Sequence, residues 1–395
     1  MNARNTLLSA AGGFALGYAA YRALEAAAAL AAPRSARKAD ASAYGALRRA
    51  LATAGIARSI ASSAATAYGP LAARFERNAQ ACPQWLAPAV FAAQIALVDA
   101  VAELPVEFAE GHEVERRFGL TEQTPQSWLG DYVKGQALTG GVAAVLALLL
   151  GAALRKWPQT WAFYATAGTL PLLIAANVAV PVYVLPLFNT YVPLEGPLEQ
   201  RLRALAARFG VGDAQILRMD MSKQTKKANA FVIGIGRTHR IVVADTLIDH
   251  FTPEEIEFVV AHELGHYVSK DTWRFIAVGQ LAAGAAIFAA RAALGNAPPE
   301  QIARPGTLAK IQFIAGALAQ VLRPAIAAFS RSREWGADRF AVRATNDPLT
   351  GASAFRRLRD QNLAEDEQPA WFEFLFSTHP SLKARIAALE GAAKG

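Results

Sequence analysis

Long stretches without a charged residue separate the apolar parts of the chain from the polar parts. A helix needs about 20 predominantly apolar residues to span the hydrocarbon core of a membrane. We predict a membrane-spanning helix for each of five stretches that are free or nearly free of charge: residues 78–98 (with an apolar core at 85–98), 135–154, 160–186, 275–290 and 311–329. The last two flank a loop with two adjacent prolines at 295–300, and together they predict a helical hairpin.

Two weaker apolar stretches precede these five. Residues 6–32 follow Arg4 and resemble a signal peptide, but the apolar stretch is too long for one and indicates a retained first helix. Residues 51–70 contain Arg58 and several serines, so a membrane span and an amphipathic or soluble helix both remain open. The predicted total is about seven spans, of which five rest on the stretches above.

The segments 195–271 and 331–395 have ordinary charged compositions and face water. Both are rich in basic residues, which favours the cytoplasmic side of a membrane. The two predicted crossings between them place both segments on the same side. In the first segment these basic residues are Arg201, Arg203, Arg208, Arg218, Lys223, Lys226 and Lys227.

Composition agrees with a chain that is partly in a membrane. Of the 395 residues, 53% are hydrophobic and 18% charged, below the quarter that is usual for soluble domains. The single cysteine, Cys82, excludes an intramolecular disulfide and a cysteine-rich metal site. The net charge of +8 is spread over loops without interleaved aromatics, which argues against nucleic acid and fits loops beside an anionic membrane surface.

The segment 251–266, Phe-Thr-Pro-Glu-Glu-Ile-Glu-Phe-Val-Val-Ala-His-Glu-Leu-Gly-His, predicts an amphipathic helix. Thr252, Pro253 and Glu255 form a helix-start pattern of cap, first-turn proline and acidic first turn. The apolar residues that recur at helical spacing and predict its buried face are Ile256, Val259, Val260 and Leu264.

On this helix His262 and His266 lie four residues apart and therefore on one face. Two imidazoles so placed can bind one zinc ion, and Glu263 between them can act as general base toward a water molecule. The chain has only six histidines, so a chance His-Glu-x-x-His is rare. The motif therefore indicates a metal-dependent hydrolase.

A catalytic zinc ion needs a third protein ligand, a later His or a Glu. Glu334 offers a carboxylate in a segment that looks helical, and Asp338 lies four residues on, on the same face. Asp338 could accept the free N–H of a ligating histidine. Because arginines surround both acids, a solvated salt-bridge face is equally compatible with this spacing.

The chain resembles the integral-membrane zinc endopeptidases related to the type-1 CAAX prenyl protease. The resemblance covers roughly residues 100–390, and six stretches carry it in order: 186–196, 227–231, 241–247, 262–266, 330–338 and 379–386. It implies a gluzincin-type domain with His262, His266 and Glu334 as ligands of one zinc ion per chain. It also implies Glu263 as catalytic base and Asp338 as the residue that orients a ligand histidine.

The resemblance further assigns Asn229, His379 and Arg385 to holding the substrate or stabilising the oxyanion. From the residues alone, His379 could instead cap a helix before Pro380, and Asn229 could be a turn residue. Residues 230–235 and 241–243 predict two strands around the turn 236–239, and an edge of this hairpin could align an extended peptide.

The other histidines match no ligand position. His239 lies in the predicted turn and His250 precedes the zinc helix. His112 lies in the carboxylate-rich segment 107–115, where a second metal site is conceivable, but we expect a solvated loop.

These observations predict a mainly α fold: a polytopic membrane helix bundle with a zinc protease domain that contains a small β-hairpin or sheet. The predicted parts are a membrane region at 1–194, the zinc-motif part at 195–271, a membrane hairpin at 272–330 and a C-terminal peptidase part at 331–395. We expect a bacterial inner (cytoplasmic) membrane, with the site on the cytoplasmic side.

The predicted function is a membrane zinc metalloendopeptidase that acts on a peptide or membrane-protein substrate in the lipid bilayer, without nucleic acid. The alternatives are a quality-control protease with broad substrates and a non-catalytic scaffold. The scaffold predicts a damaged site, and the intact Glu263 argues against it. The sequence does not indicate an oligomeric state.

Overall fold

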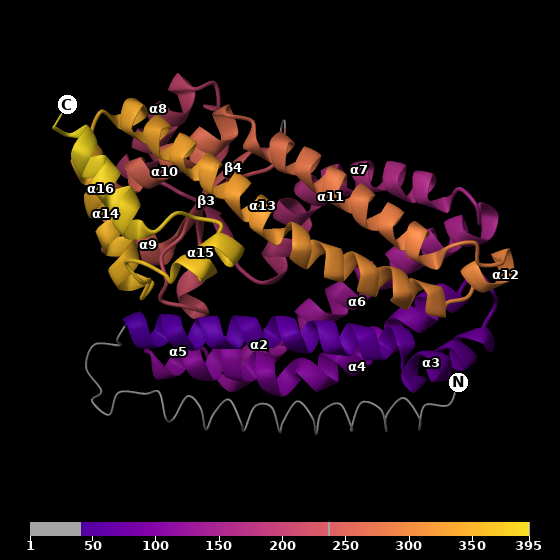
Figure 1. Ribbon diagram of the computed structural model, residues 1–395. Coiled ribbons are helices and arrows are strands. Elements are labelled where there is room, and N and C mark those ends of the chain that lie inside the picture. Colours follow the sequence, from indigo (N-terminus) through magenta and orange to yellow (C-terminus); the bar gives the residue numbers. More distant parts are fainter. Residues whose placement is uncertain (1–40, 236–237, 395) are drawn as a thin grey trace.

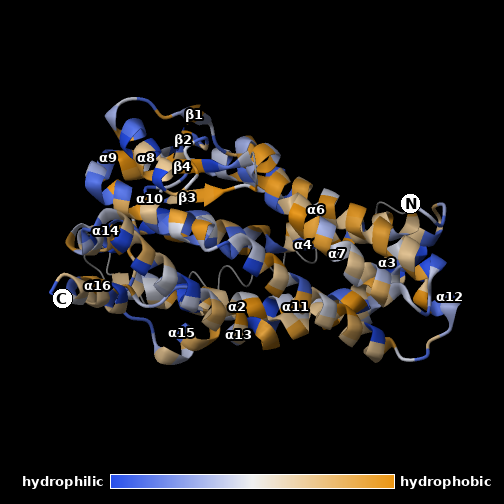
Figure 2. Ribbon diagram, turned by 90° about the horizontal axis from the view of Figure 1, so that it is seen from above, coloured by the Kyte–Doolittle hydropathy of each residue, from blue (hydrophilic) through white to orange (hydrophobic). Residues whose placement is uncertain are grey.

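The structure is a computed structural model that describes residues 41–235 and 238–394. The predicted first helix at 6–32 lies outside the described residues. Figure 1 shows long helices arranged in two layers, with a small sheet and shorter helices gathered at one end. Figure 2 shows that hydrophobic residues prevail along the long helices, whereas hydrophilic residues are concentrated at the end that carries the sheet.

In the described part of the chain, five helical segments are long and apolar enough to cross a membrane, which confirms the five predicted spans. The first is α4 (Ala87–Phe108), which continues through the π-helical turn η1 (Ala109–Glu113) into α5 (Val114–Arg117). The second is α6 (Pro125–Lys156), and the third is α7 (Trp161–Ala179), prolonged by η2 (Val180–Val184) and η3 (Leu185–Leu187). The remaining two are α11 (Asp271–Leu294) and α13 (Gly306–Thr345), joined through the short α12 (Pro299–Ile302) as the predicted hairpin.

From residue 41 on, where the description begins, two helices precede these spans. α2 (Ala41–Tyr68) covers most of the predicted weak span at 51–70 but is not among the five apolar segments. α3 (Pro70–Gln80) ends before α4 begins at Ala87, so the charge-free residues 78–98 do not form one helix. α2 contacts α13, which belongs to the other layer of long helices (Figure 1).

The solvated loop that we expected at 107–115 is wrong, because the backbone stays helical there. His112 lies in the π-helical turn η1, is fully buried, and stacks on Phe108 with ring centroids 4.8 Å apart. Its Nε2 is 2.8 Å from the carbonyl oxygen of Gln123. Nor is Glu115 solvated, because it accepts a hydrogen bond from Tyr44 and pairs with Lys227. Within the described ranges, no group of possible metal ligands forms at this segment.

The sheet has four strands in the order β1-β2-β4-β3. They are β1 (Tyr191–Pro193), β2 (Gln215–Met219), β3 (Ala230–Ile233) and β4 (Arg240–Ala244). β2 and β4 are parallel, whereas β1 and β3 pair antiparallel with their neighbours. The predicted hairpin of β3 and β4 is confirmed, and β3 forms an edge of the sheet.

Helix α10 (Pro253–Val268) lies at the centre of the peptidase part. Its predicted apolar face is buried in the largest core, which also contains residues from the sheet and from five other helices. These are α8 (Pro197–Arg208), α9 (Asp245–His250), α14 (Pro348–Gln361), α16 (Leu382–Ala392) and the C-terminal part of α13. The short α15 (Ala370–Phe376) packs on α13, and the turn η4 (Met221–Lys223) follows β2.

Helix α13 joins the membrane part to the peptidase part. It is continuous over 40 residues and therefore passes through the boundary that we predicted between residues 330 and 331. Its N-terminal half contributes the membrane span, and its C-terminal half packs against α10 and carries Glu334. The membrane helix thereby fixes the position of residues in the candidate site.

Candidate metal centre

The helix that carries the two histidines begins with a complete capping box. The Thr252 hydroxyl accepts a hydrogen bond from the Glu255 backbone N–H at 3.2 Å, and the Glu255 carboxylate accepts from the Thr252 backbone N–H at 3.0 Å. Glu255 also accepts from Ser353 and Arg357 of α14. These contacts satisfy exposed N–H groups of the first turn and tie the helix start to α14.

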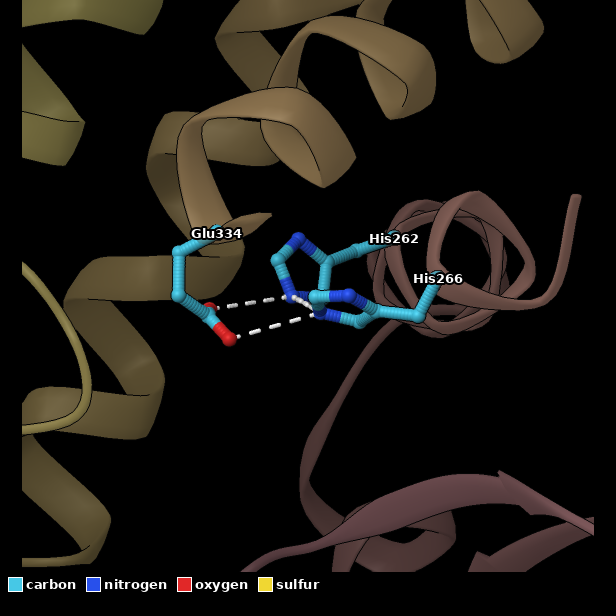
Figure 3. A group of neighbouring side chains, drawn as sticks. All are labelled: His262, His266 and Glu334. Atoms are coloured by element: carbon cyan, nitrogen blue, oxygen red, sulfur yellow. Dashed lines mark hydrogen bonds and ion pairs between the residues drawn. The ribbon is translucent and has the colours of Figure 1, made fainter. Parts of the chain in front are cut away.

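His262, His266 and Glu334 converge at one point (Figure 3). The two Nε2 atoms lie 3.3 Å apart. The Glu334 carboxylate places Oε2 3.3 Å from Nε2 of His262 and Oε1 3.4 Å from Nε2 of His266. Glu334 and Asp338 are both 5% exposed, so the solvated salt-bridge face that the spacing left open is absent.

Two carboxylates orient the two imidazole rings. Nδ1 of His262 lies 2.9 Å from Oδ1 of Asp338, and Nδ1 of His266 lies 2.9 Å from Oδ2 of Asp271. A proton on each Nδ1 donates to its carboxylate, and this assignment leaves each Nε2 with a lone pair. The two lone pairs and the Glu334 oxygens then point at one another, so the group consists of acceptors only.

Such a set of acceptors fits a bound cation. Two histidine nitrogens and one glutamate oxygen are a ligand set of catalytic zinc, with a fourth position left open. Oε2 of Glu334 is buried and has no hydrogen-bond donor among the described residues, as a metal-ligating oxygen would. Without a metal, burial disfavours the charged imidazole, but Asp338 and Glu334 outweigh it and raise the pKa of His262 to about 9.

Glu263 lies beside this group and is free to react. Its carboxylate has no hydrogen-bond or ion-pair partner within residues 41–235 and 238–394, and it is partly buried. Burial raises the pKa of Glu263, which brings it closer to the range where a carboxylate accepts and returns a proton at neutral pH.

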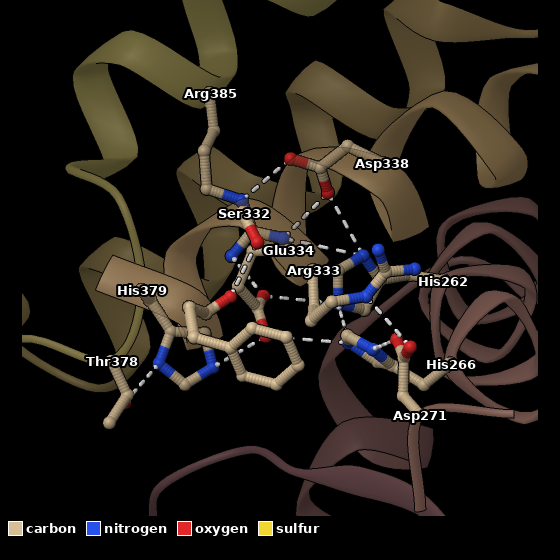
Figure 4. Close-up of polar contacts among 11 residues, drawn as sticks. His262, His266, Asp271, Ser332, Arg333, Glu334, Asp338, Thr378, His379 and Arg385 are labelled. Atoms are coloured by element: carbon tan, nitrogen blue, oxygen red, sulfur yellow. Dashed lines mark hydrogen bonds and ion pairs between the residues drawn. The ribbon is translucent and has the colours of Figure 1, made fainter. Parts of the chain in front are cut away.

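A second layer of charges surrounds the two orienting carboxylates (Figure 4). Arg385 donates to Asp338 from Nε at 2.9 Å and from Nη2 at 2.6 Å, and its Nη1 lies 3.4 Å from Glu334. Arg333 donates from Nε to Asp271 at 2.7 Å. Arg385 is buried, and its guanidinium contacts both of these acids.

Sequence reasoning found Asp338 but missed Asp271. Asp271 is the first residue of α11 and follows Lys270, whose positive φ of 56° turns the chain sharply between α10 and α11. An acidic residue within two turns of the second histidine was a signal. The sequence does not predict the sharp turn at Lys270 that brings this carboxylate back to His266.

His379 contacts the group from another element, and Asn229 lies in the same pocket as His379. His379 lies in the loop between α15 and α16, its side chain is 61% exposed, and its Nε2 is 3.4 Å from Oε1 of Glu334. Asn229 is exposed just before β3, and its carbonyl accepts from the Ala244 N–H at 3.0 Å. Both residues line one pocket of about 770 Å³, together with Arg385.

The remaining histidines stay outside this group. The ring of His239 packs edge-on against Tyr267, with centroids 4.5 Å apart. His250 ends α9, and its carbonyl accepts from Arg357. Neither belongs to the group of possible metal ligands, in agreement with the sequence analysis.

Two family models match the chain, one in each half. The sequence model of peptidase family M48 matches residues 194–393, about half of the chain. The model described as CAAX prenyl protease N-terminal, five membrane helices, matches residues 39–190. The chain belongs to peptidase family M48. Three of the five spans found in the described part of this M48 peptidase lie within 39–190. The family description gives five membrane helices for this region, so the number of spans is approximate.

Curated relatives support the assignment. An uncharacterized metalloprotease, YhfN of Bacillus subtilis, is 25% identical over 75% of this chain and 71% of its own length. The CAAX prenyl protease 1 homolog of Oryza sativa is 27% identical over 76% of this chain and 73% of its own. CAAX prenyl protease 1 of Saccharomyces cerevisiae is 29% identical, but over 48% of this chain and 43% of its own.

A solved structure shares the fold. The crystal structure of S. mikatae Ste24p superposes with a TM-score of 0.69 over 77% of this chain and 75% of that chain, at 24% identity. The M48 peptidase is therefore a multi-pass membrane zinc metalloendopeptidase with peptide substrates, as predicted. These findings favour neither the non-catalytic scaffold nor the broad quality-control protease.

Proposed function

We propose that His262, His266 and Glu334 hold one zinc ion and that Glu263 is the general base of peptide hydrolysis. The single observation that carries this proposal is the buried all-acceptor group, with two Nε2 atoms 3.3 Å apart and beside them a Glu334 oxygen that accepts no hydrogen bond from the described residues. When bound, zinc polarises the scissile carbonyl and lowers the pKa of a water molecule to about 7.

Glu263 takes a proton from the attacking water and later delivers it to the leaving amine. Its freedom from hydrogen bonds and its raised pKa support both transfers. Asp338 and Asp271 hold the two imidazoles in the tautomer that presents Nε2. Arg385 pairs with Asp338, and this contact supports a positioning role for it.

His379 and Asn229 act on the substrate side. The exposed His379 lies next to the Glu334 carboxylate, from where an N–H can donate to the oxyanion that develops on the scissile carbonyl. Asn229 precedes the edge strand β3, whose free backbone edge can pair with an extended peptide. The shared pocket supports this common role.

The substrate is a peptide that belongs to, or is anchored at, the membrane. The relatives named CAAX prenyl protease 1 suggest a segment like that of CAAX prenyl proteins. The pocket has walls from α2, from the membrane helix α13 and from the peptidase part, which supports entry from the membrane side. The basic residues of 195–271 favour the cytoplasmic face of a bacterial inner membrane.

The test is Glu263→Gln in the full chain, in detergent or liposomes. Glutamine keeps the shape but cannot take the proton, so zinc content should remain while hydrolysis of profiled membrane peptides falls by a factor of about 100 or more. Glu254→Gln, on the exposed face of the same helix, is the matched control and should keep wild-type activity. Wild-type turnover by Glu263→Gln would refute the assigned base.

A further inference from the structure

The pocket that contains His379 reaches the membrane helix α13 at Arg323. Besides Asn229 and His379, its walls include Ile56 of α2, Arg323 of α13 and Phe376 of α15. Its volume of about 770 Å³ holds several residues of an extended peptide. His379 and Arg385 line this pocket and also contact Glu334, so the pocket adjoins the metal group.

Arg323 is a charged residue in the apolar part of a predicted membrane span. It is partly buried, and its guanidinium lies over the Phe376 ring at 5.5 Å from the centroid. Among the described residues no carboxylate pairs with it, and no hydrogen bond to it is formed. Ionisable residues inside membrane spans are costly to keep, and they face a cavity where they serve binding or transport.

Other arginines of the same pocket already have partners. Arg49 pairs with Glu365, Arg385 pairs with Asp338, and Arg48 donates to the carbonyl oxygen of Glu110. Among the described arginines that line the pocket, Arg323 alone has neither an ion pair nor a hydrogen bond, so a bound ligand can supply its partner. A guanidinium over an aromatic ring and open to a cavity is suited to a carboxylate, which it can bind with two parallel hydrogen bonds.

Arg323 and Glu334 lie eleven residues apart on one helix, close to three full turns, so they project from the same face. The rise between them is roughly 16 Å. An extended peptide covers that distance in about five residues at roughly 3.3 Å each. A peptide with its scissile bond at the metal group can therefore place a carboxylate at Arg323.

We propose that Arg323 is a specificity residue that binds a carboxylate of the substrate about four to five residues from the scissile bond. This inference rests on the proposed peptidase function. Two sources share the chemistry, namely the α-carboxylate of a peptide that ends there and an acidic side chain at that position. In either case the enzyme selects substrates that carry a negative charge at this distance from the cleaved bond.

The experiment uses one peptide identified by substrate profiling, in which the fifth residue from the cleaved bond is the last. It is prepared with a free C-terminal carboxylate, as the C-terminal amide, and as the amide with Asp in that last position. We expect wild-type kcat/KM to be at least about tenfold higher for a carboxylate form than for the plain amide, mainly through KM.

Arg323→Gln should remove this preference and leave hydrolysis of the plain amide within about twofold of wild type. Arg323→Lys should keep part of the preference, and Arg343→Gln, an exposed arginine on the same helix, should keep all of it. If the enzyme prefers only the free acid, Arg323 binds the C-terminal carboxylate. If it prefers the Asp form equally, Arg323 binds any carboxylate at that distance.

Two results would overturn the inference. One is a wild-type enzyme that cleaves the acid and amide forms equally, a result that does not depend on the folding of any variant. The other is an Arg323→Gln enzyme that loses the same factor on all three peptides. Cleavage of none of the three peptides by wild-type enzyme would instead refute the proposed function.

Discussion

At the scale of single residues, the site depends on two buried carboxylates that hold two histidines. Asp338 and Asp271 each lie 2.9 Å from an Nδ1 atom, and each is held in turn by an arginine. The sequence predicted that His262 and His266 lie together, because helical spacing alone places them on one face. Asp271 could not be placed from spacing, because its contact depends on the corner at Lys270.

We expect Asp271→Asn to weaken zinc binding by about tenfold to a hundredfold, because the amide holds the His266 tautomer less strongly. Competition with a chromophoric chelator measures this loss. Asp249→Asn, an exposed site on α9, is the matched control and should bind zinc as the wild type does. Equal affinities for both variants would show that Asp271 does not support the histidine.

The wrong prediction of a solvated loop around His112 also has its cause in single residues. The carboxylates around it suggested a solvated loop, and composition could not show that the segment stays helical. His112 lies one helical turn after Phe108, and its ring stacks on the Phe108 ring in the interior. Glu115 pairs with Lys227, which comes from a distant part of the chain. Pairing over such a distance leaves no local pattern in the sequence.

At the scale of elements, the site depends on how closely α10 approaches α13. Gly265 lies between the two histidine ligands, and a Cβ atom there would be 3.0 Å from the Cα of Ala337 and 3.1 Å from Cβ of Phe340. This close approach is what brings Glu334 to the histidines. The sequence predicted both helices but not their contact, because helix packing depends on side chains far apart in the chain.

Gly265→Ala should therefore push α13 outward and lower both zinc affinity and kcat/KM by about tenfold or more. This expected loss is opposite in sign to the effect of helix propensity, because alanine is more favourable than glycine in a helix interior by roughly 1 kcal/mol. Gly336→Ala is the matched control, since its Cβ would meet only the flexible Arg333 side chain. Thermal unfolding with and without added zinc separates the two effects, and full zinc affinity in Gly265→Ala would contradict the role of this contact.

At the scale of the whole molecule, α13 links a membrane bundle to a peptidase. Large apolar side chains remain exposed on the long helices, as lipid-facing residues would be; examples are Leu146, Leu149, Leu170, Leu172 and Val321. Charge-free stretches were enough to predict these spans. They could not predict that α13 continues into the site, because its charged C-terminal half resembles a separate soluble helix.

The two crossings of α11 and α13 should place both peptidase segments on one side of the membrane. In a Cys82→Ala background, cysteines at the exposed positions Asp249 and Lys394 should react with an impermeant maleimide from the same side of oriented vesicles. A cysteine at Glu300, between the two spans, should react only from the opposite side. Labelling of all three from one side would refute the hairpin topology.

The central claim is that two histidines of α10 and a glutamate of α13 form a zinc site. The most direct measurement is the zinc content of the purified full chain by elemental mass spectrometry, compared with that of a His262→Ala, His266→Ala double variant. The proposed site predicts about one zinc ion per wild-type chain and almost none in the folded variant. A wild-type chain without zinc, or a double variant that retains it, would contradict the claim.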